Sequence, residues 1–423
     1  MARVWDVVVV GGGPAGCMTA LTLHTLGHSV VVVDEKALGS DGLPPFRPSQ
    51  YSGETISPSA MEILERLGVT LDYDGSPHLE WQGTRSIWSS ADAVDQDFIF
   101  NKRGQRGWIL HRTVFDQDLR KRVSETGIEI ISSSSVRSAS KPDEGLWALE
   151  VLQAPSPGEG DKEHEGHRLA LSASWVVDAT GRRASIARLM GFAPHKLDDL
   201  TAFVVHFEEC GPSHNSRTCQ HDRRVMIEAS ELGWWYSAHL PLVGGRCQRV
   251  VIFHTDSDHA AARQARQAAG FRELLQTSGQ TIYQVLQRGG FDTDERRPAC
   301  VSAASQLCWP PMRSDVCFVA VGDAAMAFDP LSSQGIQQAL AGGVGAANCV
   351  SRVLTGQDAS AADIFNTLCR EEFERYVSER AYVYRSLPED KAGDSFWQRR
   401  RGEATGPLPW LTDPEPATHE TAT

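Results

Sequence analysis

The chain has 423 residues, of which 41% are hydrophobic and 22% charged, as in a globular enzyme and unlike a disordered or fibrous protein. This length exceeds what one hydrophobic core usually serves, so two domains are expected, and they can be interleaved in sequence. With 41 basic and 54 acidic residues, the formal charge of −13 argues against nucleic acid or an anionic membrane as a partner. The nine cysteines include no Cys-x-x-Cys pair, so a reducing compartment and a cytoplasmic location are expected.

The N-terminal part contains two β-branched runs, residues 5–10 and 28–34, on either side of a segment of helix length. This order predicts a strand, a helix and a second, parallel strand. A Gly-x-Gly-x-x-Gly pattern follows the first run and consists of Gly11, Gly13 and Gly16. Such glycines permit a tight turn, close approach of a pyrophosphate and close helix packing, and Asp34 stands where a carboxylate can bind a ribose. A dinucleotide site is therefore predicted, with an ordinary glycine-rich turn as the alternative; the glycines also argue against a signal peptide.

Further apolar runs predict strands at residues 128–132, 146–152, 175–180 and 316–323. The polar segment 156–167 between two of them is predicted to be a solvated hairpin loop whose histidines bind no metal. Residues 201–254 hold runs spaced like antiparallel strands, which predicts a sheet that walls a second domain. A helix is expected from Ile364 to Tyr384, with recurring faces that carry Phe365, Leu368, Phe373 and Tyr376.

The segment from Val321 to Leu340 joins a Gly-Asp pair to an Asp-Pro pair, two serines and a glycine. Pro330 is expected to help end the extended chain, and Ser332 or Ser333 to cap the following helix. Gly335 would let a planar ring approach the backbone, because it has no side chain. The helix N-terminus would then stabilise negative charge on such a ring.

Four segments in order resemble the superfamily of FAD-dependent monooxygenases and flavin halogenases, over the chain up to about residue 400. They are the glycine-rich start, WILHRTVFDQDL (108–119), WVVDATGRRASIAR (175–188) and VGDAAMAFDPLSSQGIQQAL (321–340). The resemblance implies FAD as the cofactor. In that family the residue matching Asp323 binds the ribityl chain, the residue matching Arg112 reaches the cofactor, and the helix after Gly335 points at the isoalloxazine ring.

The expected fold is α/β, with an FAD-binding Rossmann-like domain interleaved with an antiparallel-sheet substrate domain and followed by a C-terminal helical segment. The expected boundaries are 1–56, 107–192 and 301–355 for the FAD-binding domain, 57–106 and 193–300 for the substrate domain, 356–404 for the helical segment and 405–423 for a flexible tail. The residues expected to bind FAD are Gly11, Gly13, Pro14, Ala15, Gly16, Asp34, Glu35, Arg112, Gly181, Asp323, Pro330, Ser333, Gly335 and Ile336.

Two stretches, GETISPSAMEILERLGV (53–69) and GWWYSAHLP (233–241), look most like the halogenase-like branch. That branch includes enzymes that hydroxylate a tryptophan inside a polypeptide during tryptophylquinone formation. Flavin halogenases carry a lysine downstream of the Gly-Glu pair, whereas no lysine lies between Glu54 and Asn101 here. Tryptophan halogenases have a glutamate in place of Ser332 and a Trp-x-Trp-x-Ile-Pro motif that GWWYSAHLP lacks.

We therefore expect a monooxygenase that uses dioxygen and a flavin C4a-hydroperoxide to hydroxylate an electron-rich aromatic substrate. The substrate is expected to resemble indole or tryptophan, either as a small molecule or within a peptide or protein. Single-component hydroxylases have Asp-Gly in the middle motif, whereas Thr180 precedes Gly181 here. The glycines of GGVGAAN (342–348) lie within an expected helix and are interpreted as packing, so a separate flavin reductase or another external donor is the expected electron source.

Glu54, Trp235 and His239 are the candidate catalytic residues. The aromatic run 234–236 lies on a predicted strand, so at most two of its side chains can face one pocket, and packing explains each equally well. His239 and His111 could act as acid or base, but a structural hydrogen-bonded role is favoured for both. Glu54 is expected to shape the flavin site, as a helix cap or as an acid beside the flavin.

No metal site is predicted: HTDSDH (254–259) holds metal-ligating residue types but is interpreted as a turn after a strand. Three alternatives to the monooxygenase stay open. They are a flavin halogenase, an FAD oxidoreductase that transfers hydride, such as a reductase of prenyl double bonds, and a non-catalytic flavin-binding protein. No apolar stretch is long enough to span a membrane, which counts mildly against the prenyl reductase.

Overall fold

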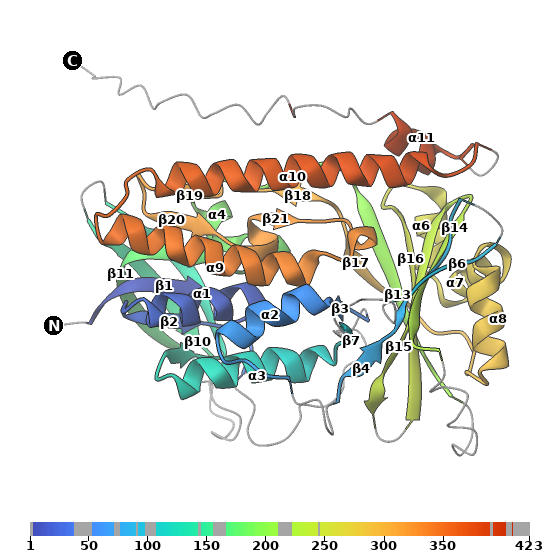
Figure 1. Ribbon diagram of the computed structural model, residues 1–423, viewed down its shortest axis with the longest axis horizontal. Helices are drawn as coiled ribbons and strands as arrows, with labels where there is room; N and C mark the ends of the chain where they lie inside the picture. The colour runs from blue at the N-terminus through green and yellow to red at the C-terminus, as the bar shows by residue number, and fades with distance from the viewer. Residues whose placement is uncertain are drawn as a thin grey trace.

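The computed structural model describes residues 3–37, 53–71, 77–89, 92–97, 107–142, 145–154, 166–209, 222–243, 246–389, 392–402 and 408. Two large sheets lie beside each other, and the long helix α10 (Ala361–Arg385) runs along both (Figure 1). Within these ranges no helix combines the length and the apolar character needed to cross a membrane. The predicted tail, 405–423, falls outside the described residues except for residue 408.

The first sheet has a parallel centre with the strand order β20 (Phe318–Ala320), β11 (His167–Asp178), β1 (Val4–Val10), β2 (Val30–Val33) and β8 (Glu129–Ile131). Antiparallel strands extend it: β19 (Met312–Arg313) pairs with β20, and β10 (Trp147–Gln153) pairs with β11 and with β9 (Ser134–Ser140). Val7 pairs with Val30 in parallel register, which confirms the predicted strand, helix, strand unit. The valine-rich strands suit this sheet because both of its faces are covered. Most of the predicted loop 156–167 lies outside the described residues.

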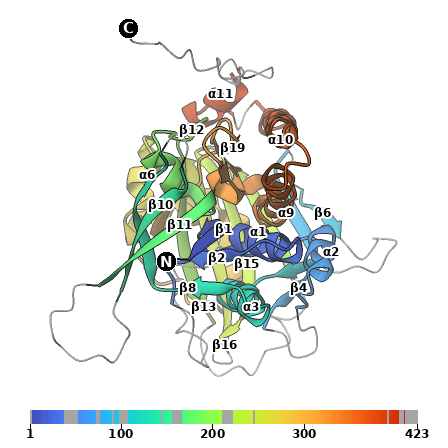
Figure 2. The same ribbon diagram turned by 90° about the vertical axis from the view of Figure 1, so that its left-hand side faces the viewer.

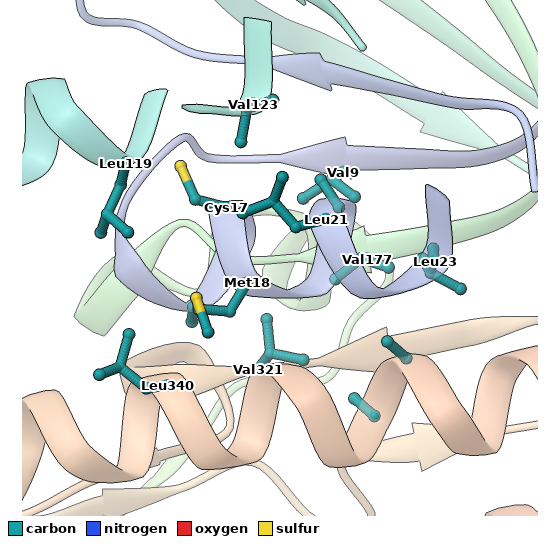
Figure 3. Packing of buried hydrophobic residues seen from close by; sticks show 14 of the residues in the cluster. Val9, Cys17, Met18, Leu21, Leu23, Leu119, Val123, Val177, Val321 and Leu340 are labelled. Carbon is teal, nitrogen blue, oxygen red and sulfur yellow. The ribbon is translucent and has the colours of Figure 1, made fainter. Parts of the chain in front are cut away.

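Helix α1 (Pro14–Thr25) is buried between the first sheet, α3 (Arg112–Glu125) and α9 (Gly335–Leu354). Met18 of α1 lies on the side of Leu340, and Cys17 lies toward Val123 (Figure 3). A β-carbon at Gly343 would stand 2.6 Å from the carbonyl oxygen of Ala15, so this glycine lets α9 approach α1 closely. Of the glycines in GGVGAAN, Gly343 thus serves helix packing, as predicted, whereas a β-carbon on Gly342 would meet nothing within 4 Å.

The second sheet has the strand order β17 (Ala299–Ser302), β13 (Leu200–Glu208), β16 (Arg246–Asp256), β15 (Gly233–Val243), β14 (Arg224–Ser230), β5 (Gly83–Ile87) and β6 (Val94–Asp97). All neighbours are antiparallel except β14 and β5, so the antiparallel sheet predicted for residues 201–254 is confirmed. β16 continues through Asp256, which pairs with Leu200. The turn predicted at HTDSDH therefore begins later than expected, because the ladder holds its first three residues.

Three helices cover the outer face of the second sheet, namely α6 (Ala260–Ala265), α7 (Ala268–Ser278) and α8 (Gln280–Arg288). The remaining strands form two small sheets, β3 (Thr55–Ile56) with β7 (Gly107–Ile109) and β4 (Leu79–Trp81), and β12 (His195–Lys196) with β18 (Gln306–Leu307) and β21 (Met326–Ala327). The remaining helices are α2 (Pro58–Arg66), α4 (Ser185–Leu189) and α11 (Ser395–Arg401), with 3-10 turns η3 (Gly181–Arg183), η4 (Gly322–Ala324) and η5 (Pro330–Ser332).

Helix α10 lies beside α9, as the end-on view shows (Figure 2). Phe365, Phe373 and Tyr376 are buried, whereas Leu368 is 57% exposed and lies on the outer side of the helix. The predicted helix and three of its four apolar positions are thus confirmed. The α/β fold with an antiparallel second sheet is as expected, and the precise limits of the interleaved domains stay a prediction.

Candidate active site

A cavity of about 550 Å³ lies between the first sheet and the inner face of the second. Its walls come from the glycine turn after β1, the end of β2, the start of α3, the turn after β11 and the loop before α9. Of the residues predicted to bind FAD, all but Gly16 line this cavity. The structure therefore brings together segments that are more than 300 residues apart in sequence, such as Gly11 and Gly335.

The glycine turn places the N-terminus of α1 at the cavity. Gly11 has φ +111°, and a β-carbon there would lie 2.3 Å from the carbonyl oxygen of Ala179. A β-carbon on Gly16 would lie 1.9 Å from the carbonyl oxygen of Gly11, so Gly16 serves close packing. Gly13, the N-cap of α1, has no atom within 4 Å of such a β-carbon. The space beside Gly13 and the free N–H groups of the helix suit a phosphate group.

Asp34 at the end of β2 is 7% exposed and borders the cavity. Its Oδ2 accepts from Nη1 of Arg120 at 3.4 Å, an atom that also donates to the carbonyl oxygen of Gly12 at 3.4 Å. Next to it, Glu35 forms an ion pair with Arg183 at 2.5 Å. A carboxylate held in this way at the end of the second strand suits a ribose hydroxyl pair.

Arg112 joins two carboxylates at the middle of the cavity. Its Nη1 donates to Glu54 Oε1 at 3.0 Å, and its Nη2 donates to Asp116 Oδ1 at 3.1 Å. Burial opposes the charge, yet Asp116 and Glu54 raise the pKa of Arg112 above its ordinary value, so the guanidinium stays charged. Glu54 thus lines the cavity in an ion pair and does not cap α2, whose N-cap is Ser57, so a role in shaping the flavin site stays a prediction.

Asp323 and Arg182 lie together on the next wall, 3.4 Å apart. Burial raises the pKa of Asp323, while Arg182 and Arg112 oppose that shift. Arg182 also donates to the carbonyl oxygens of Ala304 and Phe328, and therefore ties β17's end to the loop before α9. These contacts fix an acid between two arginines where hydroxyl groups of an extended ligand can bind.

The loop before α9 differs in detail from the sequence-based expectation. Pro330 begins the short 3-10 turn η5, whose cap is the side chain of Asp329. Neither serine caps α9: its N-cap is Gln334, Ser333 has φ +51°, and Ser332 donates its hydroxyl to the carbonyl oxygen of Asp329 at 2.9 Å. The inserted 3-10 turn moves both serines away from the capping position. A β-carbon on Gly335 would meet no atom within 4 Å, so a flat ring has room there, as expected.

The second sheet contributes an apolar wall to the same cavity. The lining side chains of this wall are Ala202, Val204, Tyr236, Ile252, His254, Val301 and Ala303. The Tyr236 hydroxyl donates to the carbonyl oxygen of Gly53 at 2.6 Å. His254 stacks on Trp234 with ring centroids 3.6 Å apart, and burial lowers its pKa to about 3, so the imidazole is neutral at pH 7. Sequence reasoning missed His254 because its segment was interpreted as a turn.

Trp235 and His239 lie on the opposite face of the second sheet, away from the cavity. Trp235 contacts Phe253 and Phe271, and its Nε1 donates to Ser278 Oγ at 3.2 Å. His239 is 8% exposed, and burial lowers its pKa to about 3. Strand alternation puts Tyr236 on the cavity side instead, so the catalytic roles expected for Trp235 and His239 do not fit their positions. His111 caps α3 by accepting from the Val114 N–H at 3.5 Å.

No cluster of histidine, cysteine or acidic side chains with the geometry of a metal site occurs in the described part of the chain. The cavity instead offers one helix N-terminus for phosphates, one beside space for a flat ring, and carboxylates for hydroxyl groups between them. This combination defines a flavin-dinucleotide enzyme.

Residues 4–378 match the family described as FAD binding domain, and the chain belongs to this family. It is an FAD-dependent oxidoreductase of the superfamily that contains monooxygenases and flavin halogenases.

Three similar proteins can be compared with the chain. LodB of Marinomonas mediterranea, named as an FAD-dependent oxidoreductase, is 26% identical over 400 residues, which are 94% of this chain and 96% of LodB. The crystal structure of CmlS, a flavin-dependent halogenase, gives a TM-score of 0.74 at 23% identity over 95% of this chain and 68% of CmlS. The peptidyl tryptophan dihydroxylase QhpG gives 0.63 at 22% identity over 95% of this chain and 79% of QhpG. The two solved structures show a shared fold.

Proposed function

We propose that the protein is an FAD-dependent monooxygenase that hydroxylates an electron-rich aromatic ring of the indole or tryptophan kind. The observation that carries this proposal is the apolar wall of Ala202, Val204 and Ile252, which lines the same cavity as the residues suited to FAD. An aromatic ring can lie against these side chains within reach of the cofactor. The name of QhpG, a peptidyl tryptophan dihydroxylase, supports a substrate ring carried by a peptide or protein.

Reduced FAD, when bound, supplies the electrons that activate dioxygen and allows one oxygen atom to be transferred. The chain's own part is to exclude water and to orient the substrate. Val204 and Ile252 leave little for water to bind, and Tyr236 is held in place through its bond to Gly53. The N-terminus of α9 beside Gly335 would stabilise negative charge on a reduced flavin ring bound there.

Glu54 is the one candidate catalytic residue that lines the cavity. Because its Oε1 accepts from Arg112 at 3.0 Å, we assign it to holding the guanidinium in place beside the cofactor. Asp116 binds the same guanidinium from the other side, so removal of Glu54 alone leaves Arg112 charged and partly oriented. Glu54→Gln is therefore expected to weaken FAD binding only a few fold, which a titration of the apo-protein with FAD would measure.

We also propose that electrons come from a separate reductase or another external donor. Thr180 replaces the acid of the single-component hydroxylases, and its hydroxyl donates to Asp178 at 2.6 Å and accepts from the Ser185 N–H at 2.7 Å. Both functions of this hydroxyl thus hold the turn together. Anaerobic mixing of the FAD-loaded protein with NADH or NADPH alone should leave the flavin oxidised, whereas fast stoichiometric reduction would contradict this proposal.

The hydroxylation is tested with FAD-loaded protein, an NADH-driven flavin reductase, isotope-labelled dioxygen and a tryptophan-containing peptide. We expect the peptide to gain labelled oxygen, as measured by mass spectrometry. The same peptide with leucine in place of tryptophan is the control for oxidation elsewhere. If a panel of indoles, phenols and tryptophan peptides gained no oxygen while NADH was oxidised and dioxygen was reduced to hydrogen peroxide, the proposal would fail.

A flavin halogenase is the second candidate, because the halogenase CmlS shares the fold over 95% of this chain. Against it stands the sequence between Glu54 and Asn101, which contains no lysine. Bromide added to the same reaction distinguishes the two chemistries. A brominated product would replace the monooxygenase proposal, whereas an oxygenated product at high bromide would support it.

A further inference from the structure

A chain of buried hydrogen bonds joins the flavin loop, here defined as residues 329–335, to the second sheet. At its centre is Tyr384 of α10, whose hydroxyl donates to Asp329 Oδ2 at 2.7 Å and accepts from Trp234 Nε1 at 3.1 Å. All three residues are at most 1% exposed. Burial and, after it, the nearby Asp329 raise the pKa of Tyr384 well above its ordinary value, so the hydroxyl keeps the proton that it donates.

The two ends of this series of hydrogen bonds contact different walls of the cavity. Asp329 lines the cavity at the flavin loop. Trp234 is not among the described lining residues, but it stacks on His254, with an angle of 8° between the rings, and His254 lines the cavity. The Tyr384 hydroxyl therefore connects the loop beside the flavin ring to the apolar wall on which the proposed substrate lies.

Other contacts hold Asp329 without reaching that wall. The Asp329 N–H donates to the Tyr376 hydroxyl at 2.7 Å, which in turn lies 2.7 Å from Ser305 Oγ. Arg380 pairs with Asp329 at 3.3 Å and with Asp198 at 2.9 Å. Loss of the Tyr384 hydroxyl would thus leave the loop attached to α10 and packed through Leu331, and would remove its hydrogen-bonded link to Trp234 of the second sheet.

We propose that Tyr384 is a positioning residue that holds the flavin loop and the substrate wall at a fixed distance from each other. A phenol hydroxyl can donate once and accept as well, and here both functions are used. Without this hydroxyl, the Trp234 N–H and an oxygen of Asp329 each lose a buried hydrogen-bond partner. Such a loss raises the free energy of the folded protein, because water cannot replace the partner there. Only the assignment of the second wall to a substrate rests on the proposed function.

The test is a double-mutant cycle on FAD affinity, measured by titrating FAD into purified full-length apo-protein and following its fluorescence. Tyr384→Phe is expected to weaken FAD binding about three- to tenfold, because the loop is less well organised before binding. Trp234→Phe should weaken FAD binding about two- to fivefold in the wild-type background, and should add nothing in the Tyr384→Phe background. Equal effects of Trp234→Phe in both backgrounds would overturn the proposal.

Trp235→Phe is the matched control. Trp235 is as buried as Trp234, but its Nε1 donates to Ser278 on the outer face, so FAD affinity should not change. If Tyr384→Phe fails to fold, the comparison of these two tryptophan variants decides: equal FAD affinity in both would overturn the link. A second variant, Tyr376→Phe, should weaken FAD binding while leaving the effect of Trp234→Phe intact.

A separate titration with indole tests the substrate side. In the wild-type holoenzyme, indole should perturb the flavin absorbance, and Tyr384→Phe should reduce this perturbation. If the cycle shows coupling but indole leaves the wild-type spectrum unchanged, the link stands and the aromatic-substrate proposal is contradicted. If indole perturbs both proteins equally and the cycle is additive, Tyr384 does not position the two walls.

Discussion

Gly11 and Gly13 of the glycine turn have different roles, which follow from the space around each residue. At Gly11 a β-carbon would collide with the backbone of Ala179, and the residue has φ +111°, which side-chain-bearing residues rarely adopt. At Gly13 the backbone is ordinary for any residue, with φ −80°, and the space beside it is open. The first glycine is therefore required for folding, and the second for room beside the cofactor.

Gly13→Ala is accordingly expected to leave the melting temperature of the apo-protein nearly unchanged and to weaken FAD binding at least tenfold, since the methyl group would occupy the space suited to phosphate. Gly11→Ala should instead destabilise the apo-protein by more than about 1–3 kcal/mol, because the collision with the Ala179 backbone adds to the strain of the positive φ. Thermal melts and FAD titrations of both variants check this contrast. A loss of apo stability in Gly13→Ala would show that its space is needed for folding.

At the level of elements, α9 is the part that sets the shape of the site. Its N-terminus borders the cavity at Gly335, and its middle contacts α1 at Gly343, where Thr19 also donates to the Gly343 carbonyl at 3.2 Å. α1 carries the helix N-terminus that is suited to phosphate groups. The distance between the two helix N-termini therefore depends on how closely the helices approach at Gly343.

Gly343→Ala is expected to destabilise the protein by about 1–3 kcal/mol, because the added methyl group overlaps the Ala15 carbonyl. The matched control is Gly342→Ala on the same helix, where a β-carbon meets nothing within 4 Å. This control should gain up to about 1 kcal/mol from better helix propensity. Urea unfolding measures both values, and equal stability of the two variants would contradict the close contact.

The whole molecule buries several histidines in neutral form. Burial lowers the pKa of His254 and of His239 to about 3, and that of His78 to about 4. Arg249 near His239 and His111 near His78 act in the same direction. Each folded pKa is below the unfolded value of about 6.5, so the unfolded chain binds protons first as the pH falls. The stabilisation is complete above about pH 6.5 and is lost progressively toward pH 3–4.

Acidification from pH 7 to pH 5 is expected to lower the free energy of unfolding by about 2 kcal/mol for each of these histidines. Melting temperatures across this range test the expectation. His239→Gln lies away from the cavity and should make the dependence on pH shallower without changing FAD affinity. A flat profile between pH 7 and pH 5 would mean that these side chains are protonated in the folded protein.

Much of the fold could be predicted because its signals are local in sequence. The spacing of the glycines, the continuous valine runs and the strand-like runs from 201 to 254 can each be recognised within a short segment. Alternation along a strand does not indicate which of its two faces borders the cavity. The sequence therefore could not tell whether Tyr236 or Trp235 lines the cavity. His254 was missed because its segment was interpreted from its polar composition. Pairing with the neighbouring strand β13 is what keeps His254 in an extended conformation. The contacts of Asp329 with α10 join residues 47 to 55 positions apart, and no local pattern marks them.

The place of α10 also orders events during synthesis. The glycine turn emerges from the ribosome long before the flavin loop, and the loop is anchored by Tyr376, Arg380 and Tyr384, which emerge later still. Domains generally fold as their segments become available. FAD uptake is therefore expected to follow synthesis of α10, and a truncated chain released before residue 361 would present an unanchored flavin loop to chaperones and proteases.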